Sequence, residues 1–260
     1  MKSNYRYIVK AFMAMAVIAG TTSCDDFLDR EPMSSISPET YYSTAAQLEA
    51  NLNDEYPNVL PSFGQWTYGI FGEDKGTDNQ IEVNANDRYT QDRWKVPHSE
   101  SDNWKFERIY RINFFLSEAL PKFGEDMSGS QNTISGSVAT IKHYIGEMYF
   151  LRAYEYFKKL QLFGDFPIIN QPLADEMEAL REASKRFPRN EVARFIISDL
   201  DKAYAYMSDV DMATTRINKD AAMLVKSRVA LFEATWLQNF KGTAFVPLSL
   251  IHISEPTRPY

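Results

Sequence analysis

The stretch EMYFLRAYEYFKKLQLFGDFP, residues 147–167, decides the architecture of this 260-residue chain. Its apolar pattern begins upstream, where Ser137 can cap a helix, and continues to Phe163. The apolar face is expected to comprise Ile141, Ile145, Met148, Tyr149, Tyr156 and Leu160. A helix that is apolar over so much of its surface is central and buried, so Arg152 is expected to pair with an acid. Gly164 ends this helix, and residues 165–169 leave it in extended form.

Apolar residues at helical spacing predict further helices on either side. These helices are expected over residues 37–53, 102–120, 190–207 and 218–240. Ser37, Asn190 and Asn218 can supply N-cap side chains, whereas Pro57 and Pro121 are expected to close the first two helices. The chain is therefore predicted to be mainly α-helical, with pairs of antiparallel helices.

The helices also carry a weak repeat. Arg152–Leu160 and Arg228–Trp236 are loosely alike and begin 76 residues apart, about two helical-hairpin periods of roughly 34 residues plus insertions. This spacing favours a tetratricopeptide-like scaffold of helical hairpins. Residues 62–101 interrupt the scaffold, because they show no helical period and are rich in Gly, Asn and Asp. We expect them to form a long irregular loop region, and loops of this length tend to be functional.

The composition excludes several classes of protein. The chain has 28 Lys and Arg against 35 Asp and Glu, for a net charge of −7. Binding to nucleic acid or to anionic lipid needs a basic surface, so neither is expected from this balance. The apolar fraction of 44% is typical of a globular domain and argues against wholesale disorder. Aromatic residues are abundant, with 17 Phe, 15 Tyr and 4 Trp.

The N-terminus has the order of a secretory signal. Three basic residues precede the apolar run 11–20, and small residues lead to Cys24. The run is about half the ~20 residues that a membrane-spanning helix needs, so residues 1–23 are predicted to be a lipoprotein signal peptide. Cys24 is then the lipidation site; the alternative is a free thiol after an ordinary cleavage site. A lipid there would anchor the protein without spanning the membrane.

The long loop holds the candidate ligand-binding residues. Sugars stack their CH-rich faces on aromatic rings and hydrogen-bond to Asp, Asn, Gln and Arg, and a rigid ring loses little entropy on binding. On this chemistry the candidates are Trp66, Tyr68, Asp78, Arg88 and Trp94. The structural alternative is that these rings pin the loop onto the helices.

Motifs of catalysis and cofactor binding do not emerge. The sequence has no G-x-S-x-G elbow, P-loop or dinucleotide fingerprint, and its many acids single out no catalytic pair. His143 and Glu147 lie four residues apart, but two ligands do not make a metal site, and we interpret them as a helix-surface pair. No cofactor, metal or enzymatic activity is therefore predicted.

Taken in order, these motifs resemble the N-terminal half of the SusD/RagB family of Bacteroidota outer-membrane lipoproteins. Glu147–Pro167 is the most specific match, close to the family signature R-A-x-x-Y-F-x-L-x-x-x-F-G-D-x-P. The other similar segments are Cys24–Asp29, Ser37–Leu52, Trp104–Asn113, Pro188–Ala203 and Ala221–Leu231. The resemblance covers residues 24–247, which are expected to be an incomplete, truncated SusD-like helical region. Residues 248–260 resemble translated adapter sequence and are expected to be non-native.

The resemblance implies a surface-exposed, lipid-anchored outer-membrane protein that binds an oligo- or polysaccharide. It also implies a partner, a SusC-like TonB-dependent transporter to which the glycan or another nutrient is delivered without chemistry. Two alternatives remain open at this stage. One is a tetratricopeptide-like protein-interaction scaffold at the outer membrane, and the other is a surface glycosidase with two facing carboxylates.

Overall fold

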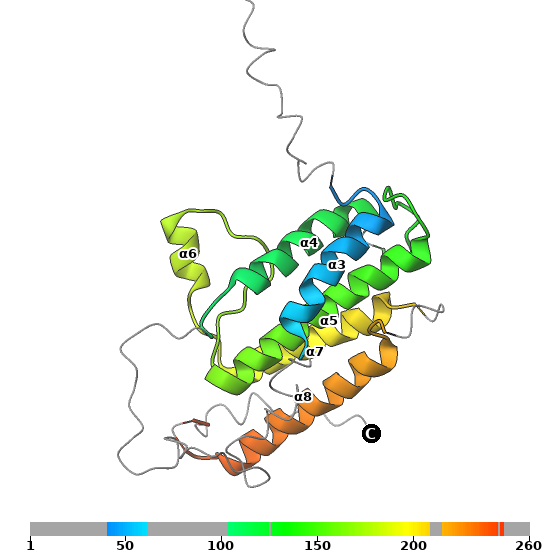
Figure 1. Ribbon diagram of the computed structural model, residues 1–260. Helices are drawn as coiled ribbons and strands as arrows, with labels where there is room; N and C mark the ends of the chain where they lie inside the picture. The colour runs from blue at the N-terminus through cyan, green and yellow to red at the C-terminus, as the bar shows by residue number, and fades with distance from the viewer. Residues whose placement is uncertain (1–40, 62–102, 125, 209–214, 244, 247–260) are drawn as a thin grey trace, which may run out of the picture. The chain divides into compact units, whose positions relative to one another are not determined.

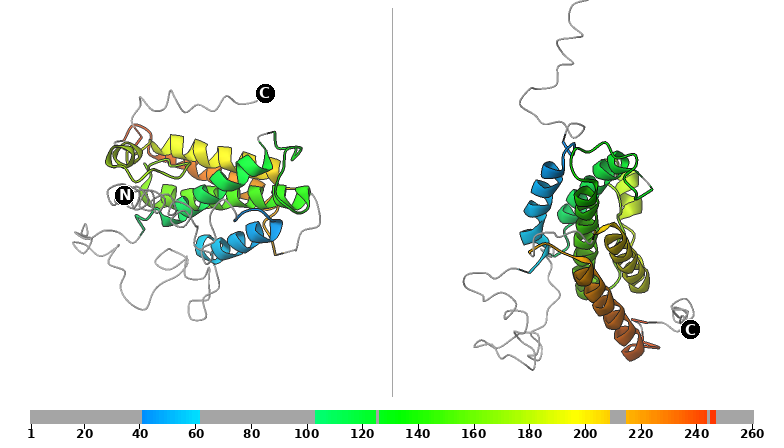
Figure 2. Two further views of the ribbon diagram at one scale, coloured as in Figure 1. Left: turned by 90° about the horizontal axis from the view of Figure 1, so that it is seen from above. Right: turned by 90° about the vertical axis from the view of Figure 1, so that its right-hand side faces the viewer.

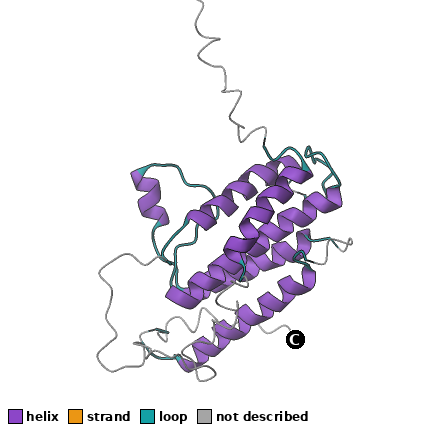
Figure 3. Ribbon diagram, in the orientation of Figure 1, coloured by secondary structure: helices purple, strands orange, loops and turns teal. Residues whose placement is uncertain are grey.

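The computed structural model describes residues 41–61, 103–124, 126–208, 215–243 and 245–246. Within these ranges the chain forms six α-helices and no strand (Figures 1 and 3). The helices are α3 (Ala45–Val59), α4 (Glu107–Phe123), α5 (Val138–Phe163), α6 (Met177–Ala183), α7 (Arg189–Tyr206) and α8 (Lys219–Asn239). The prediction of a mainly α fold is confirmed.

Helix α5 is the centre of the fold. It contacts α3, α4, α7 and α8, and seventeen of its 26 residues are buried. The long helices run alternately in opposite directions along the chain, as the views in Figures 1 and 2 agree. The predicted central helix is therefore confirmed, and its nearly continuous apolar surface is explained by partners on several sides.

Gly146 lies where α5 closely approaches the C-terminal end of α7. A Cβ atom at this position would lie 2.8 Å from the backbone nitrogen of Met207 and 2.9 Å from the carbonyl oxygen of Ala203. Backbone atoms cannot move aside as a flexible side chain can. The absence of a side chain at Gly146 therefore sets how tightly the two helices pack.

The connection from α5 to α7 is held by a small set of hydrogen bonds. Gly164 ends α5 with φ +69°, a conformation that favours glycine. Asp165 then accepts a hydrogen bond at Oδ1 from the backbone N–H of Arg189, 2.9 Å away. Phe166 and Phe187 exchange two backbone hydrogen bonds of 3.2 and 3.1 Å. Asp165 thus satisfies a free amide at the start of α7 from 24 residues upstream.

Several predicted helix ends are wrong. The first helix begins at Ala45, capped by a reciprocal Thr44–Gln47 box, and it extends through Pro57. The last carbonyls of this helix find other donors: Leu60 N–H donates to Tyr56 O, and Lys158 Nζ donates to Val59 O. Position 37 lies outside the described residues.

The next helix also shifts. It begins at Glu107 rather than at residue 102, because Trp104 is not part of the helical stripe. It also continues past Pro121. The Trp104 ring instead packs edge-on against Phe163 and Phe166, with centroids 4.8 and 4.9 Å apart. An aromatic residue one turn before a helix mimics the helical spacing that predicted an earlier start.

The cap predictions have mixed outcomes. Asn218 caps α8 through its Oδ1, which accepts from the Ala221 N–H at 2.9 Å, as expected. Ser137 precedes α5 without a side-chain cap bond, and Asn190 lies buried inside α7. Helix α6, which the sequence did not predict, is seven residues long and buries none of them.

Candidate functional site

The residues that sequence reasoning selected as functional fall outside the described part of the chain. Cys24 lies in 1–40, and Trp66, Tyr68, Asp78, Arg88 and Trp94 lie in 62–102. Their roles therefore stay predictions. Among the described residues we consider two buried polar networks and two open pockets in turn.

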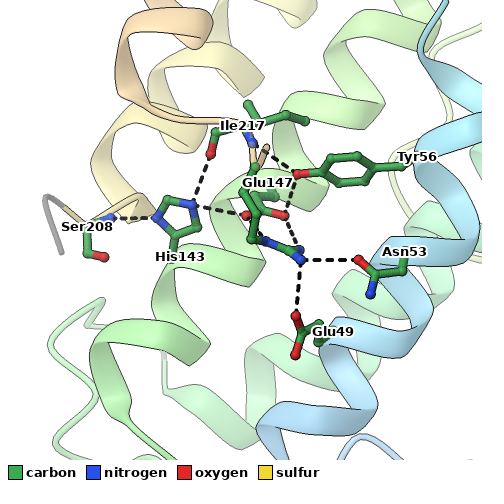
Figure 4. A network of polar contacts seen from close by, with 8 residues as sticks. Glu49, Asn53, Tyr56, His143, Glu147, Ser208 and Ile217 are labelled. Carbon is green, nitrogen blue, oxygen red and sulfur yellow. Dashed lines mark hydrogen bonds and ion pairs between the residues drawn. The ribbon is translucent and has the colours of Figure 1, made fainter. Parts of the chain in front are cut away.

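The first network is centred on Glu147 of α5 (Figure 4). Arg216 donates from Nε to Glu147 Oε1 at 2.8 Å and from Nη2 to Oε2 at 2.6 Å. The Tyr56 hydroxyl donates to Oε2 at 2.8 Å and accepts from the Ile217 N–H at 3.1 Å. Arg216 Nη1 also donates to Glu49 and Asn53 of α3. One carboxylate thus ties together α3, α5 and the residues that lead into α8.

His143 completes this network and corrects one interpretation. The ring is 1% exposed and Glu147 is fully buried, so they are not a helix-surface pair. Nδ1 accepts from the Ser208 N–H at 3.3 Å, which places the ring proton on Nε2. Nε2 lies 3.0 Å from both the Ile217 carbonyl oxygen and Glu147 Oε1. The pair is buried because residues from after α7 and before α8 close over it.

The electrostatics of the network favour a structural role. Burial, and then the negative charge of Glu147, raise the pKa of Tyr56, so its hydroxyl stays protonated and can donate. Burial lowers the pKa of Arg216, but its hydrogen bonds to Glu147 and the negative charge of that carboxylate, with smaller contributions from Tyr56 and Tyr144, together raise it overall. Both oxygens of Glu147 are fully used by protein donors. The network therefore joins helices, and the carboxylate at its centre has no oxygen left for a ligand.

The second network confirms the predicted pairing of Arg152 with an acid. Its guanidinium binds Asp199 of α7 through Nε and Nη2 at 2.6 and 2.8 Å. Nη1 donates to Asn113 of α4 at 2.9 Å and to the Asn170 carbonyl at 3.1 Å. Asp199 is fully buried and Arg152 is 3% exposed. Three helices and the extended segment after α5 meet at this single side chain.

The described residues contain no cluster of three or more His, Cys, Asp or Glu that could hold a metal ion. None of the helices that the structure describes is long and apolar enough to cross a membrane.

Two open pockets lie elsewhere on the helices. The first has a volume of about 240 Å³ and is almost wholly apolar, with Phe106, Tyr110 and Leu180 in its walls. The second has a volume of about 360 Å³ and mixes polar with aromatic groups, where the ends of α5 and α8 face the connection to α7. Sequence reasoning missed both pockets. Nothing in the spacing of the sequence marked Gln161, Arg186 and Trp236 as residues of one pocket.

Known proteins with similar sequences give the family. Residues 26–231 match the SusD-like family model described as starch-binding associating with the outer membrane. The chain belongs to the SusD-like family. The resemblance inferred from the ordered motifs is thereby confirmed, and the match spans every described helix except the end of α8. The family is associated with the outer membrane.

Individual SusD-like proteins show how much of the family this chain covers. Two from Formosa agariphila are each 25% identical, over 233 and 253 residues, and cover 82% and 93% of this chain. These alignments span only 41% and 46% of the relatives, so the matched part of the chain covers less than half of their length. A solved SusD-like carbohydrate-binding protein of Bacteroides fragilis has a TM-score of 0.52 and 19% identity. It matches 76% of this chain and 39% of its own, which supports the SusD-like helical fold.

Proposed function

We propose that this SusD-like chain belongs to a surface-exposed lipoprotein that binds a glycan, or another nutrient, without catalysis. It delivers that ligand to a SusC-like TonB-dependent transporter in the outer membrane. The observation that carries the proposal is the family match over 26–231, whose description joins starch binding to the outer membrane. The name of the Bacteroides fragilis neighbour, a carbohydrate-binding protein, points the same way.

Two parts of the sequence support the finer claims. The signal-like residues 1–23 followed by Cys24 suit a lipid anchor, which would hold the protein at the membrane surface. The aromatic and polar residues of 62–101 suit a glycan, with Trp66, Tyr68 and Trp94 as stacking rings and Asp78 and Arg88 as hydrogen-bonding partners. Residues 24–247 then form the SusD-like region, and 248–260 are non-native.

The binding claim is tested with a panel of polysaccharides in affinity gels and calorimetry. Wild type, Trp66→Ala and Trp94→Ala are compared with Tyr204→Ala, which removes a ring that is 45% exposed on α7. We expect retention by at least one polysaccharide and a loss of about tenfold in affinity for one tryptophan variant only, since a stacked ring contributes about 0.5–1.5 kcal/mol beyond its buried area. Failure to bind any polymer would overturn the glycan claim.

The anchor and the partner need separate measurements. Labelled fatty acid should be incorporated into wild type and not into Cys24→Ser when each is expressed in a Bacteroidota host. Wild type should co-purify with a SusC-like transporter from detergent-solubilised outer membranes. Wild type that carries no label would refute the anchor, while leaving glycan binding untouched.

A further inference from the structure

The mixed pocket between the ends of α5 and α8, here called the α5–α8 pocket, has the chemistry of a ligand site. It is open, holds about 360 Å³, and is lined by groups from three segments. Those that matter for binding are Gln161, Asp165, Arg186, Arg189, Trp236 and Phe245. Its lining has both polar and apolar groups, whereas the pocket beside α4 is almost wholly apolar. This mixture suits a ligand with both hydroxyl groups and CH faces.

One cation of the lining has no ion pair among the described residues. Arg189 is paired with the buried Glu233, whereas Arg186 forms no ion pair in the described part of the chain. Because opposite charges attract most strongly where water is partly excluded, the unpaired Arg186 favours an anionic group over a neutral one.

Both arginines are held in place and keep donors free. Arg189 is 5% exposed; its Nε and Nη2 bind Glu233 at 3.0 and 2.9 Å, and its Nη1 has no hydrogen bond among the described residues. Arg186 is exposed, lies 4.6 Å over the Trp104 ring, and forms no ion pair in the described part of the chain. Planar guanidinium donors match a carboxylate better than an ammonium group would.

The remaining groups suit a sugar ring. Asp165 uses one oxygen to accept from Arg189 N–H, which leaves the other for a hydroxyl group. Phe245 is 68% exposed, and its neighbour Phe240 packs edge-on against it, with ring centroids 5.8 Å apart.

We infer that the α5–α8 pocket binds a carboxylate-bearing sugar unit, such as a uronic acid residue of a glycan. The inference rests on the proposed glycan-binding function and adds a second site, remote in sequence from residues 62–101. Arg186 and Arg189 bind the carboxylate, Asp165 and Gln161 bind hydroxyl groups, and Phe245 stacks on the sugar ring.

The test is calorimetric titration of the 260-residue chain with trigalacturonic acid and with maltotriose, a neutral trisaccharide of similar size. We expect binding of the acidic probe at millimolar concentration or below, and at least tenfold weaker binding of maltotriose. Arg186→Ala should lower the affinity for trigalacturonic acid about 10- to 100-fold, the range that a hydrogen bond to a charged group contributes. Arg181→Ala is the matched control, because that arginine is 76% exposed on α6 and does not line the pocket.

The possible results distinguish failure of the α5–α8 pocket proposal from failure of the proposed glycan-binding function. No binding of trigalacturonic acid to wild type overturns the inference, as does binding that Arg186→Ala leaves unchanged. Equal affinity for maltotriose overturns the choice of a carboxylate. If a neutral polysaccharide still binds and depends on Trp66 or Trp94, the proposed function stands while this site falls. Raising the salt concentration should weaken the binding of trigalacturonic acid by wild type more than its binding by Arg186→Ala.

Discussion

Removing Arg152 should be among the most damaging single changes to the fold. Arg152→Leu leaves Asp199 fully buried, with Lys202 as its nearest remaining cation at 3.8 Å. It also removes the donors to Asn113 and to the Asn170 carbonyl. Breaking one side of a buried ion pair costs about 3–5 kcal/mol, because the other charge stays desolvated without a partner.

That loss is a large part of the ~5–15 kcal/mol that stabilises a typical domain. At about 2–4 °C per kcal/mol, the melting temperature should fall by roughly 6–20 °C. Urea unfolding followed by circular dichroism measures the free energy directly. Arg181→Leu is the control, since its exposed side chain should change the stability by less than about 0.5 kcal/mol.

The double variant Arg152→Leu/Asp199→Leu completes the cycle. It removes both charges, so its loss should be smaller than the sum of the two single losses. Additive losses would refute the claim that the charges stabilise each other. A loss below about 1 kcal/mol for Arg152→Leu would refute the account of Arg152 as the junction of three helices.

Three further changes test other contacts. Gly146→Ala should lower the free energy of unfolding by about 1–2 kcal/mol in urea, because the added Cβ would meet the backbone at the end of α7. This loss is expected although alanine favours helices over glycine by up to about 1 kcal/mol. A stabilised variant would contradict the close approach. Tyr56→Phe should cost about 1–3 kcal/mol. The pKa of Tyr56 is raised in the folded state, so the stability contributed by its hydroxyl is complete below its pKa in the unfolded chain, about 10, and is lost as the pH rises further. The stability of Tyr56→Phe should therefore fall less steeply than that of wild type above about pH 10. An unchanged slope would contradict this. Asn218→Ala should cost about 1 kcal/mol in thermal melts, against a few tenths for Asn218→Gly, and equal losses would argue against the cap.

The helices could be predicted from the sequence where burial controls the pattern. The central helix has apolar residues on most sides, and no other element could satisfy that pattern. Helix ends were less predictable, because their partners are remote. Asp165 binds the first amide of α7 from 24 residues away, and Lys158 binds the last carbonyl of α3 from 99 residues away. Such partners cannot be inferred from local spacing.

The polar networks show the same division. The pairing of Arg152 followed from its place in an apolar helix, because a buried charge needs a partner. The burial of His143 did not follow, since its cover comes from Ser208 and Ile217, which are 65 and 74 residues later. The α5–α8 pocket is assembled from three segments, none of which carries a recognisable motif. The predicted loop residues lie outside the described chain and remain to be tested.

The contacts of Arg216 have a consequence for the order of folding. This residue meets Glu49, 167 positions earlier, and so closes almost the whole described chain into one loop. The entropy lost in closing a loop grows with its length. The neighbouring helices α4, α5 and α7 should therefore associate before α3 binds to the residues at the start of α8. We expect truncation of Arg216 to speed unfolding while leaving the folding rate nearly unchanged. Helix α3 would then be among the last to join, although it is the first of the described helices to be synthesised.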